Sequence, residues 1–182
     1  MTTTVIAEPQ VWAGCLNCYN SGRLVGHWFG VTEAADVDLA AVHRGSGVNT
    51  AAEGCEELWC LDIDGLPVRR EMGLLEAAEW GEVFTEAGES WPAVAAWVRT
   101  GDYIAEGDTD LPVLSDFTDR YCGHWDSFRD YAFGLADDIG LLRDVPEEIE
   151  RYFHWDAWIR DLKMDHSTAE APDGGVYIFR SL

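Results

Sequence analysis

Cysteine and histidine are the residues whose types and spacing come nearest to a chemical site in this chain. Cys15 and Cys18 are separated by two residues, a spacing that metal and redox sites use. A structural zinc site needs two more ligands, and Cys122 with His124 is the one plausible partner pair in the sequence. We interpret Cys15 and Cys18 as small buried residues at a strand end, and we predict no metal and no cofactor.

Other motifs with catalytic or binding chemistry are incomplete. The segment that starts at Asp62 resembles the beginning of a calcium loop, but Gly73 occupies the twelfth position, where a Glu is required. The five histidines show no pair at helical ligand spacing, and the sequence contains neither a phosphate-binding glycine loop nor a nucleophile elbow. Carboxylates are too numerous for any two to be singled out as an acid–base pair. The sequence therefore predicts a protein that is not an enzyme.

Negative charge is the dominant property of the chain. It has 34 acidic and 12 basic residues, a formal net charge of −22. Residues 1–30 carry one acid and one base, whereas residues 75–110 carry nine acids and one base. Because crowded like charges destabilise a compact protein, either salt screens this charge or the charge itself serves the function.

Composition narrows the classes of protein. Hydrophobic residues make up 47% and aromatic residues 12% of the chain, which predicts a folded protein rather than a disordered acidic tail. A single lysine, Lys163, argues against direct binding of nucleic acid, and anionic lipids would repel the protein from a membrane. No apolar stretch approaches the ~20 residues that span a bilayer. An odd number of cysteines and no recognisable secretory signal predict a cytoplasmic protein.

The elements that would position these charges follow from periodicity. Strands are expected near residues 9–16, 24–31 and 57–63, with a possible short helix at 34–42. Residues 74–87 predict an amphipathic helix with apolar residues on one side and only glutamates on the other. Ser90 and Pro92 begin a second helix that ends at Gly101. Residues 102–112 are interpreted as a linker.

The C-terminal third alternates helices and strands. Ser127, with Asp130 three residues later, predicts the start of a helix that Gly140 ends. Further helices are expected after Pro146 and over residues 155–163, followed by a final strand at 176–179. The predicted fold is α+β, an elongated chain of three small units. These are a β-rich unit (1–66), a helical acidic unit (67–111) and an α+β unit with a dimer contact (112–182).

Composition and charge placement leave three interpretations open. Duplex DNA carries one negative charge per ~1.7 Å of axis, so 22 charges match roughly 37 Å of duplex, and a dimer about twice that. A protein with this charge on helix faces would bind in the groove of a DNA-binding enzyme as a decoy. The alternatives are a halophilic or merely acidic protein, and an acidic regulatory or adaptor protein. Uneven placement of the acids and nine tryptophans favour the decoy.

Several motifs resemble the ArdA-type antirestriction proteins. From Tyr19 to Trp28 the chain shows the pattern Tyr-Asn-x-Gly-x-Leu-x-Gly-x-Trp that follows the first strand in that family. The similar segments are residues 11–28, 117–132, 135–140, 146–149, 152–162 and 176–180. His154 is a departure, because the family often has Asp there.

The resemblance implies a DNA mimic, encoded on a mobile element, that inhibits type I restriction-modification enzymes by occupying the DNA-binding groove of the methyltransferase core. It also implies a homodimer formed through the C-terminal unit, with residues 135–145 near the contact. The predicted mimic surface comprises Glu76, Glu79, Glu82, Glu86, Glu89, Asp102, Glu106, Asp108, Asp110, Asp116, Asp119, Asp126, Asp130, Asp137, Asp138, Asp144, Glu147, Glu148 and Glu150. The predicted dimer interface comprises Leu135, Ile139, Leu141, Leu142 and Val145, with intramolecular core as the alternative, above all for Leu135 and Ile139.

Overall fold

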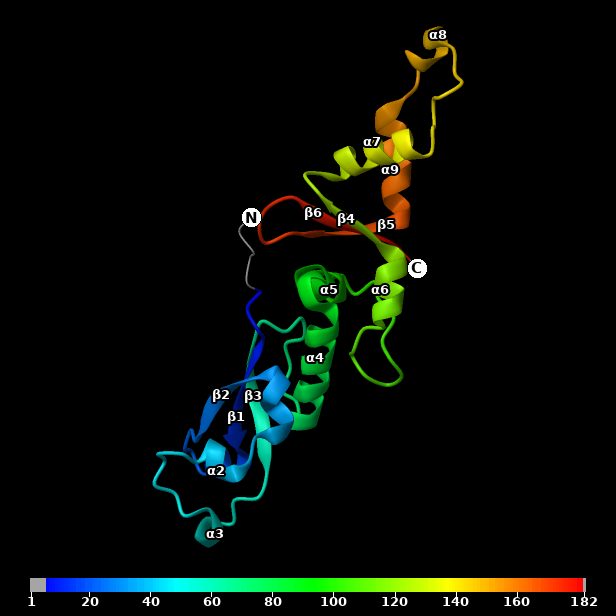
Figure 1. The fold of residues 1–182 in the computed structure, drawn as a ribbon. Coiled ribbons are helices and arrows are strands. Elements are labelled where there is room, and N and C mark those ends of the chain that lie inside the picture. Colours follow the sequence, from blue (N-terminus) through cyan, green and yellow to red (C-terminus); the bar gives the residue numbers. More distant parts are fainter. Residues whose placement is uncertain (1–5, 182) are drawn as a thin grey trace. The chain divides into compact units, whose positions relative to one another are not determined.

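The computed structural model describes residues 6–181 and shows an α+β protein (Figure 1). The strands are β1 (Gln10–Cys15), β2 (Gly26–Gly30), β3 (Leu58–Asp64), β4 (Tyr121–Trp125), β5 (His166–Glu170) and β6 (Val176–Arg180). The helices are α1 (Leu16–Asn20), α2 (Leu39–Val42), α3 (Thr50–Glu53), α4 (Leu74–Ala87), α5 (Trp91–Thr100), α6 (Leu114–Arg120), α7 (Phe128–Asp138), α8 (Glu147–Glu150) and α9 (Trp155–Leu162). Short 3-10 helices are η1 (Val31–Asp36), η2 (Gly88–Ser90) and η3 (Lys163–Asp165).

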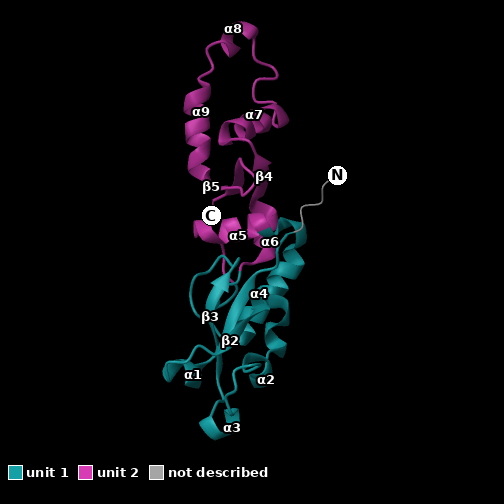
Figure 2. Ribbon diagram, turned by 90° about the vertical axis from the view of Figure 1, so that its left-hand side faces the viewer, with its two compact units in different colours: residues 1–91, 106–111 teal, residues 92–105, 112–182 magenta. Residues whose placement is uncertain are grey.

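The described chain forms two compact units, which Figure 2 colours separately. The first unit runs up to Trp91 and includes Glu106–Leu111, and the second holds Pro92–Ala105 and continues from Pro112. The segment expected to be a linker thus contributes to both units. The division into three units stays a prediction.

The first unit is built on a three-stranded antiparallel sheet in the order β2-β1-β3. Val11, Ala13 and Cys15 alternate along the central strand and are fully buried, as period-two side chains on one face should be. The pairing of β1 with β3 shifts register between Trp12 and Ala13. This sheet positions the end of β1, from which α1 follows directly.

Helix α4 packs against η1 and β3 in the same unit. Ala77, Trp80 and Gly81 form its buried side. A Cβ atom at Gly81 would lie 2.6 Å from the carbonyl oxygen of Val31, so only glycine allows this approach of η1 to the helix. The contact fixes which side of α4 remains exposed.

The second unit is built on a three-stranded antiparallel sheet in the order β4-β6-β5. Its central strand β6 is buried on both faces. Ile178 packs with Phe128 and Tyr131 of α7, whereas Phe179, on the opposite face, lies near the rings of Trp97 and Phe117. Two aromatic layers therefore enclose this sheet.

Most predicted elements are confirmed. The helices expected at 74–87, 90–101 and 127–140 are α4, α5 and α7, and the four expected strands are β1, β2, β3 and β6. The region 34–42 instead contains the end of η1 and the separate helix α2, because Val37 adopts an extended conformation between them. Helices α1, α3 and α6 and strands β4 and β5 were not predicted.

Candidate acidic interaction surface

The exposed side of α4 carries a run of glutamates. Glu79, Glu82 and Glu86 are exposed along the helix, and Glu89 is exposed in the following turn η2. At 100° per residue Glu79, Glu82 and Glu86 fall within a sector of roughly 60°, whereas Glu89 follows Gly88, where the helix ends. The buried Trp80 side and the exposed glutamate side together confirm the amphipathic pattern read from the sequence.

This arrangement of charge works against the stability of the helix. Glu82 and Glu86 are four residues apart, and a like-charge pair at this spacing destabilises a helix by about 0.2–0.5 kcal/mol. Glu86 also lies in the last turn, where the helix dipole favours cations and where no basic residue is present. Full burial of a Trp side chain contributes roughly 4–6 kcal/mol at about 25 cal/mol per Å². Packing of Trp80 therefore outweighs the repulsion, and within residues 6–181 none of these glutamates forms an ion pair that would stabilise the helix.

The spacing of these carboxylates can be compared with that of phosphates. At ~1.5 Å rise per residue, successive glutamates of this face lie about 4.5–6 Å apart along the axis. Along the axis of duplex DNA, the phosphates of one strand are spaced ~3.4 Å apart. One helix face is thus less densely charged than one DNA strand, so a DNA-like charge density requires acids from other elements as well.

Eleven further predicted surface acids are exposed. They are Glu106, Asp108, Asp119, Asp126, Asp130, Asp137, Asp138, Asp144, Glu147, Glu148 and Glu150. Two of them also have local roles, because Asp130 accepts a hydrogen bond from the hydroxyl of the N-cap residue Ser127, and Glu147 pairs with Arg151 at 2.6 Å. His154 caps α9 by accepting a hydrogen bond from the Ala157 N–H at 3.1 Å.

The remaining four predicted surface acids are half-buried and are bound by two arginines. Arg70 forms ion pairs with Glu76 and with Asp110, the latter at 2.7 Å between Nη2 and Oδ2. This arginine is about half exposed. The two carboxylates, above all Glu76, raise the pKa of Arg70. One arginine thus ties the 106–111 loop to the start of α4.

The second arginine, Arg120, is buried, with only 9% of its side chain exposed. Its Nη2 lies 3.0 Å from Asp102 Oδ1, and its Nη1 donates to Asp116 Oδ2 at 3.2 Å. Its Nε donates to the carbonyl of Arg180 at 2.7 Å, and the guanidinium carbon lies 5.5 Å from the ring centre of Trp97. These two carboxylates therefore neutralise a buried cation inside the second unit.

The predicted dimer residues divide by exposure. Leu135 packs against the cluster of Phe128, Tyr131 and Ile178, whereas 59% of Ile139 is exposed. Leu141, Leu142 and Val145 are half-buried in the turns after α7. The homodimer stays a prediction.

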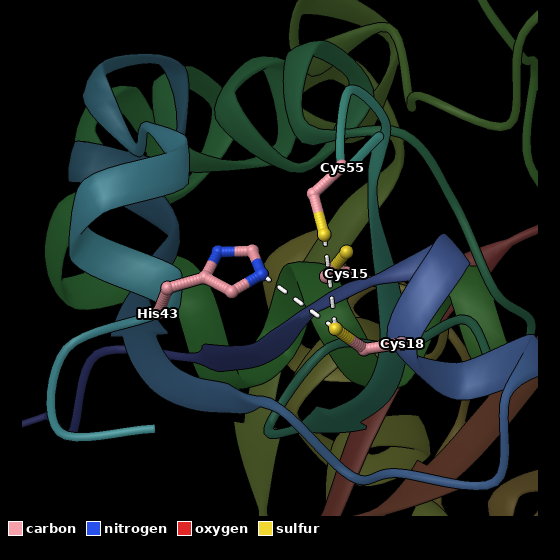
Figure 3. Close-up of side chains that lie close together, drawn as sticks. All are labelled: Cys15, Cys18, His43 and Cys55. Atoms are coloured by element: carbon pink, nitrogen blue, oxygen red, sulfur yellow. Dashed lines mark hydrogen bonds between the residues drawn. The ribbon is translucent and has the colours of Figure 1, made fainter. Parts of the chain in front are cut away.

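Two residues that lie beside Cys15 and Cys18 were not predicted from the sequence. Cys122 and His124 lie on β4 of the second unit, where the His124 ring bonds to the carbonyl of Gly174. In the described residues, Cys15 and Cys18 are instead joined by His43 and Cys55 (Figure 3). In the sequence, 24 residues separate Cys18 from His43, and 11 residues separate His43 from Cys55. No local motif therefore indicates the cluster.

These observations define an α+β protein that displays carboxylates on helix faces, and none of the helices in residues 6–181 has the length and apolar character needed to cross a membrane. Comparison with protein families gives a match to the antirestriction protein family ArdA over residues 11–177. The chain therefore belongs to the ArdA family and is an antirestriction protein, an inhibitor of restriction-modification. A comparison with curated proteins finds no match.

Proposed function

We propose that this protein inhibits type I restriction-modification enzymes in the cytoplasm by occupying the DNA-binding groove of the methyltransferase core. The glutamate face of α4 is the observation that carries the proposal. It concentrates negative charge on an exposed surface at a measurable cost to helix stability, and membership of an antirestriction family supplies a use for that charge.

The two arginine clusters refine the proposed surface. Glu76, Asp102, Asp110 and Asp116 already have cationic partners within the protein and are half-buried. Lysines and arginines of an enzyme groove would gain less from them than from exposed carboxylates. We therefore assign the working surface to the fifteen exposed acids and a positioning role to these four.

Dimerisation would extend the charged surface. Ile139 is exposed at the end of α7, and Leu141, Leu142 and Val145 follow it within six residues. We propose that a second copy covers this apolar segment and doubles the length of charge presented. Ile139→Asp should convert the dimer to a monomer in light scattering and weaken inhibition. An unchanged mass would exclude this contact.

A competition assay tests the mimic. A purified type I methyltransferase and a labelled duplex that contains its recognition site are mixed with increasing inhibitor, at several salt concentrations. Wild-type protein should displace the duplex, and its affinity should fall as salt screens the exposed charges. A halophilic protein without mimicry would instead unfold at low salt and leave the DNA bound. If the protein displaced no DNA at all of the salt concentrations, including the lowest, the proposal would be overturned.

Two variants of equal charge locate the surface. Changing Glu79, Glu82, Glu86 and Glu89 to Gln raises the formal charge from −22 to −18. Changing four exposed acids outside the proposed surface, Asp36, Glu56, Glu57 and Asp64, to their amides gives the same −18. Exposed ion pairs contribute ~0.2–1 kcal/mol each, so the loss of four pairs should weaken inhibition by a factor between about 4 and about 900, and the control should weaken it much less. Equal inhibition by both variants would remove α4 from the surface.

A further inference from the structure

Four metal-binding side chains converge in the first unit, from segments far apart in the sequence. Cys15 ends β1, Cys18 lies in α1, His43 follows α2, and Cys55 follows α3 (Figure 3). All four are buried, with exposed fractions of 8% or less. Their sulfur and ring-nitrogen atoms lie within 4.8 Å of one another. Three cysteines and one histidine are a ligand set used by structural zinc sites.

Two of the distances between these atoms are close to those of a tetrahedral site, and the others do not exceed 4.8 Å. Zn–S bonds of about 2.3 Å and Zn–N bonds of about 2.0–2.1 Å place tetrahedral ligands about 3.8 Å (S to S) and about 3.6 Å (S to N) apart. The Sγ of Cys18 lies 3.9 Å from the Sγ of Cys55 and 3.7 Å from Nε2 of His43. Little movement would be needed for these atoms to share one ion.

The ring of His43 is held in the orientation that a ligand needs. Its Nδ1 lies 2.8 Å from the carbonyl oxygen of Leu39. A carbonyl can only accept, so Nδ1 carries a proton, and when Nε2 carries none its lone pair is directed toward the Sγ of Cys18. A backbone carbonyl that fixes the second ring nitrogen is the usual outer partner of a metal-binding histidine.

The sulfur atoms also have polar surroundings. Burial raises the pKa of the Cys15 thiol, but hydrogen bonds from the Cys18 backbone N–H, the neighbouring sulfurs and the Asn17 N–H outweigh it and lower the pKa. The side-chain amide of Asn17 lies 4.0 Å from the Sγ of Cys55. Burial and the sulfurs of Cys15 and Cys55 raise the pKa of Cys18 to about 11. A divalent cation among the three sulfurs would favour their thiolate forms.

Burial of cysteines as small apolar residues explains less of this arrangement. Purely apolar packing accounts for sulfur atoms next to Ala13 and Val42. It does not require three sulfurs and an imidazole nitrogen from four separate segments to lie within 4.8 Å of one another.

We propose that Cys15, Cys18, His43 and Cys55 bind one zinc ion in a closed, structural Cys3His site. Soft thiolates with one imidazole suit zinc, and four protein ligands leave no open position for catalysis. The ion would hold α2, α3 and the loop between them onto the sheet. Both helices have only four residues, and residues 44–54 contain no buried side chain, so this segment has little apolar packing of its own.

The site is tested by measuring the metal content of the protein and the coordination geometry of the bound metal. The whole chain is used, without an affinity tag. The protein is reduced, loaded with zinc or cobalt(II), and dialysed in excess Mg²⁺, which masks the many surface carboxylates. We expect one zinc ion per chain by elemental analysis. The cobalt form should show the intense visible bands of a tetrahedral site and a thiolate-to-cobalt charge-transfer band. Absence of retained metal, or a weak octahedral cobalt spectrum, would overturn the proposal.

Ligand variants identify the residues. Cys18→Ser, Cys55→Ser and His43→Asn should each weaken zinc binding by at least about 100-fold, since even outer partners of metal ligands are worth 10- to 100-fold. Cys122→Ser changes a cysteine of the second unit and should retain one ion. Equal loss in Cys122→Ser, or full retention in all three ligand variants, would contradict the assignment.

If the ligand variants do not fold, the reactivity of the thiols in the unchanged protein tests the site instead. Alkylation followed by mass spectrometry measures the reactivity of each cysteine with zinc and after a strong chelator. Cys15, Cys18 and Cys55 should become reactive only after the chelator, whereas the reactivity of Cys122 should not change. Protection of the three that is independent of the chelator would assign them to ordinary burial and overturn the site.

Discussion

Two groups of carboxylates in this protein share residue types and differ in surroundings. Around Arg120, Asp102 and Asp116 are half-buried and face one buried guanidinium. Along α4, Glu79, Glu82 and Glu86 are exposed, and the helix has no basic residue in its last turn. The first group satisfies a charge inside the fold, whereas the second leaves its charge available to another molecule.

The difference shows that acidic residues that add equally to the net charge can have different physical effects. Carboxylates that neutralise a buried cation contribute to stability only as a set, because removal of one partner leaves a desolvated charge behind. Exposed carboxylates on one helix face repel one another at a small cost each. Changes in the two groups should therefore act on different quantities, stability in the first and inhibition in the second.

The largest effect should come from removing the buried cation. Arg120→Met leaves Asp102 and Asp116 without their guanidinium, and loss of one partner of a buried pair costs about 3–5 kcal/mol. Because both carboxylates are about one-fifth exposed, we expect a loss near 3 kcal/mol in urea unfolding. The triple variant with both aspartates changed to Asn should recover the part of this loss that is due to unpaired charge, but not the hydrogen bond to the Arg180 carbonyl. A loss below about 1 kcal/mol would mean that the two groups of acids do not differ as described.

Next in size is a change at the buried side of α4. Gly81→Ala improves helix propensity by about 1 kcal/mol, but its Cβ would lie 2.6 Å from the Val31 carbonyl oxygen. Overpacking typically costs about 1–3 kcal/mol, so we expect a net loss of stability in thermal or urea unfolding. Glu82→Ala, on the exposed side of the same helix, is the control and should not destabilise. Stabilisation by Gly81→Ala would show that η1 moves freely.

A smaller effect, of opposite sign, is expected on the exposed side. Replacing Glu79, Glu82, Glu86 and Glu89 by Gln removes repulsion worth about 0.2–0.5 kcal/mol per pair at helical spacing. Stability in low salt should rise by up to about 1 kcal/mol while inhibition falls. The gain should shrink in high salt because screening already weakens the repulsion. A loss of stability would show that these glutamates have structural partners.

The smallest effect is expected at the exposed arginine. Arg70→Gln breaks the pairs with Glu76 and Asp110, but all three side chains are at least about 30% exposed and remain hydrated. We expect a loss of no more than about 1 kcal/mol, and less in high salt. If Arg70→Gln lost as much unfolding free energy as Arg120→Met, the ion pairs of Arg70 would be as important for stability as those of the buried Arg120.

Sequence patterns predicted those helices and strands that depend on interactions between residues close together in the sequence. The apolar residues that recur at helical spacing in 74–87 form the buried side of α4. Ser127 caps α7 by accepting a hydrogen bond from the Asp130 N–H, as the spacing of these two residues predicted. Strand β5, His166–Glu170, has no alternation of large apolar residues and forms by pairing along its whole length with β6. Its existence depends on a partner that lies elsewhere in the sequence, so its own residues did not indicate it.

The sequence predicted nineteen individual acids as one mimic surface, and that surface stays a prediction. All nineteen acids are at least partly exposed, yet the sequence offered no way to know that Arg70 and Arg120 would bind four of them. Arg70 and Asp110 are 40 residues apart, and Arg120 lies 18 residues from Asp102. The distinction between paired and displayed charge rests on such contacts.

The amino-acid sequence by itself determined the net charge, the amphipathic side of α4, the approximate bounds of α4, α5, α7 and α9 and the resemblance to antirestriction proteins, because each depends on composition or on neighbours within a few residues. The tertiary structure alone decided which carboxylates meet arginines, how exposed Ile139 is, and that His43 and Cys55 join Cys15 and Cys18. Folding makes those contacts by closing long loops around packed sheets, and no short stretch of sequence encodes where such loops bring their ends together.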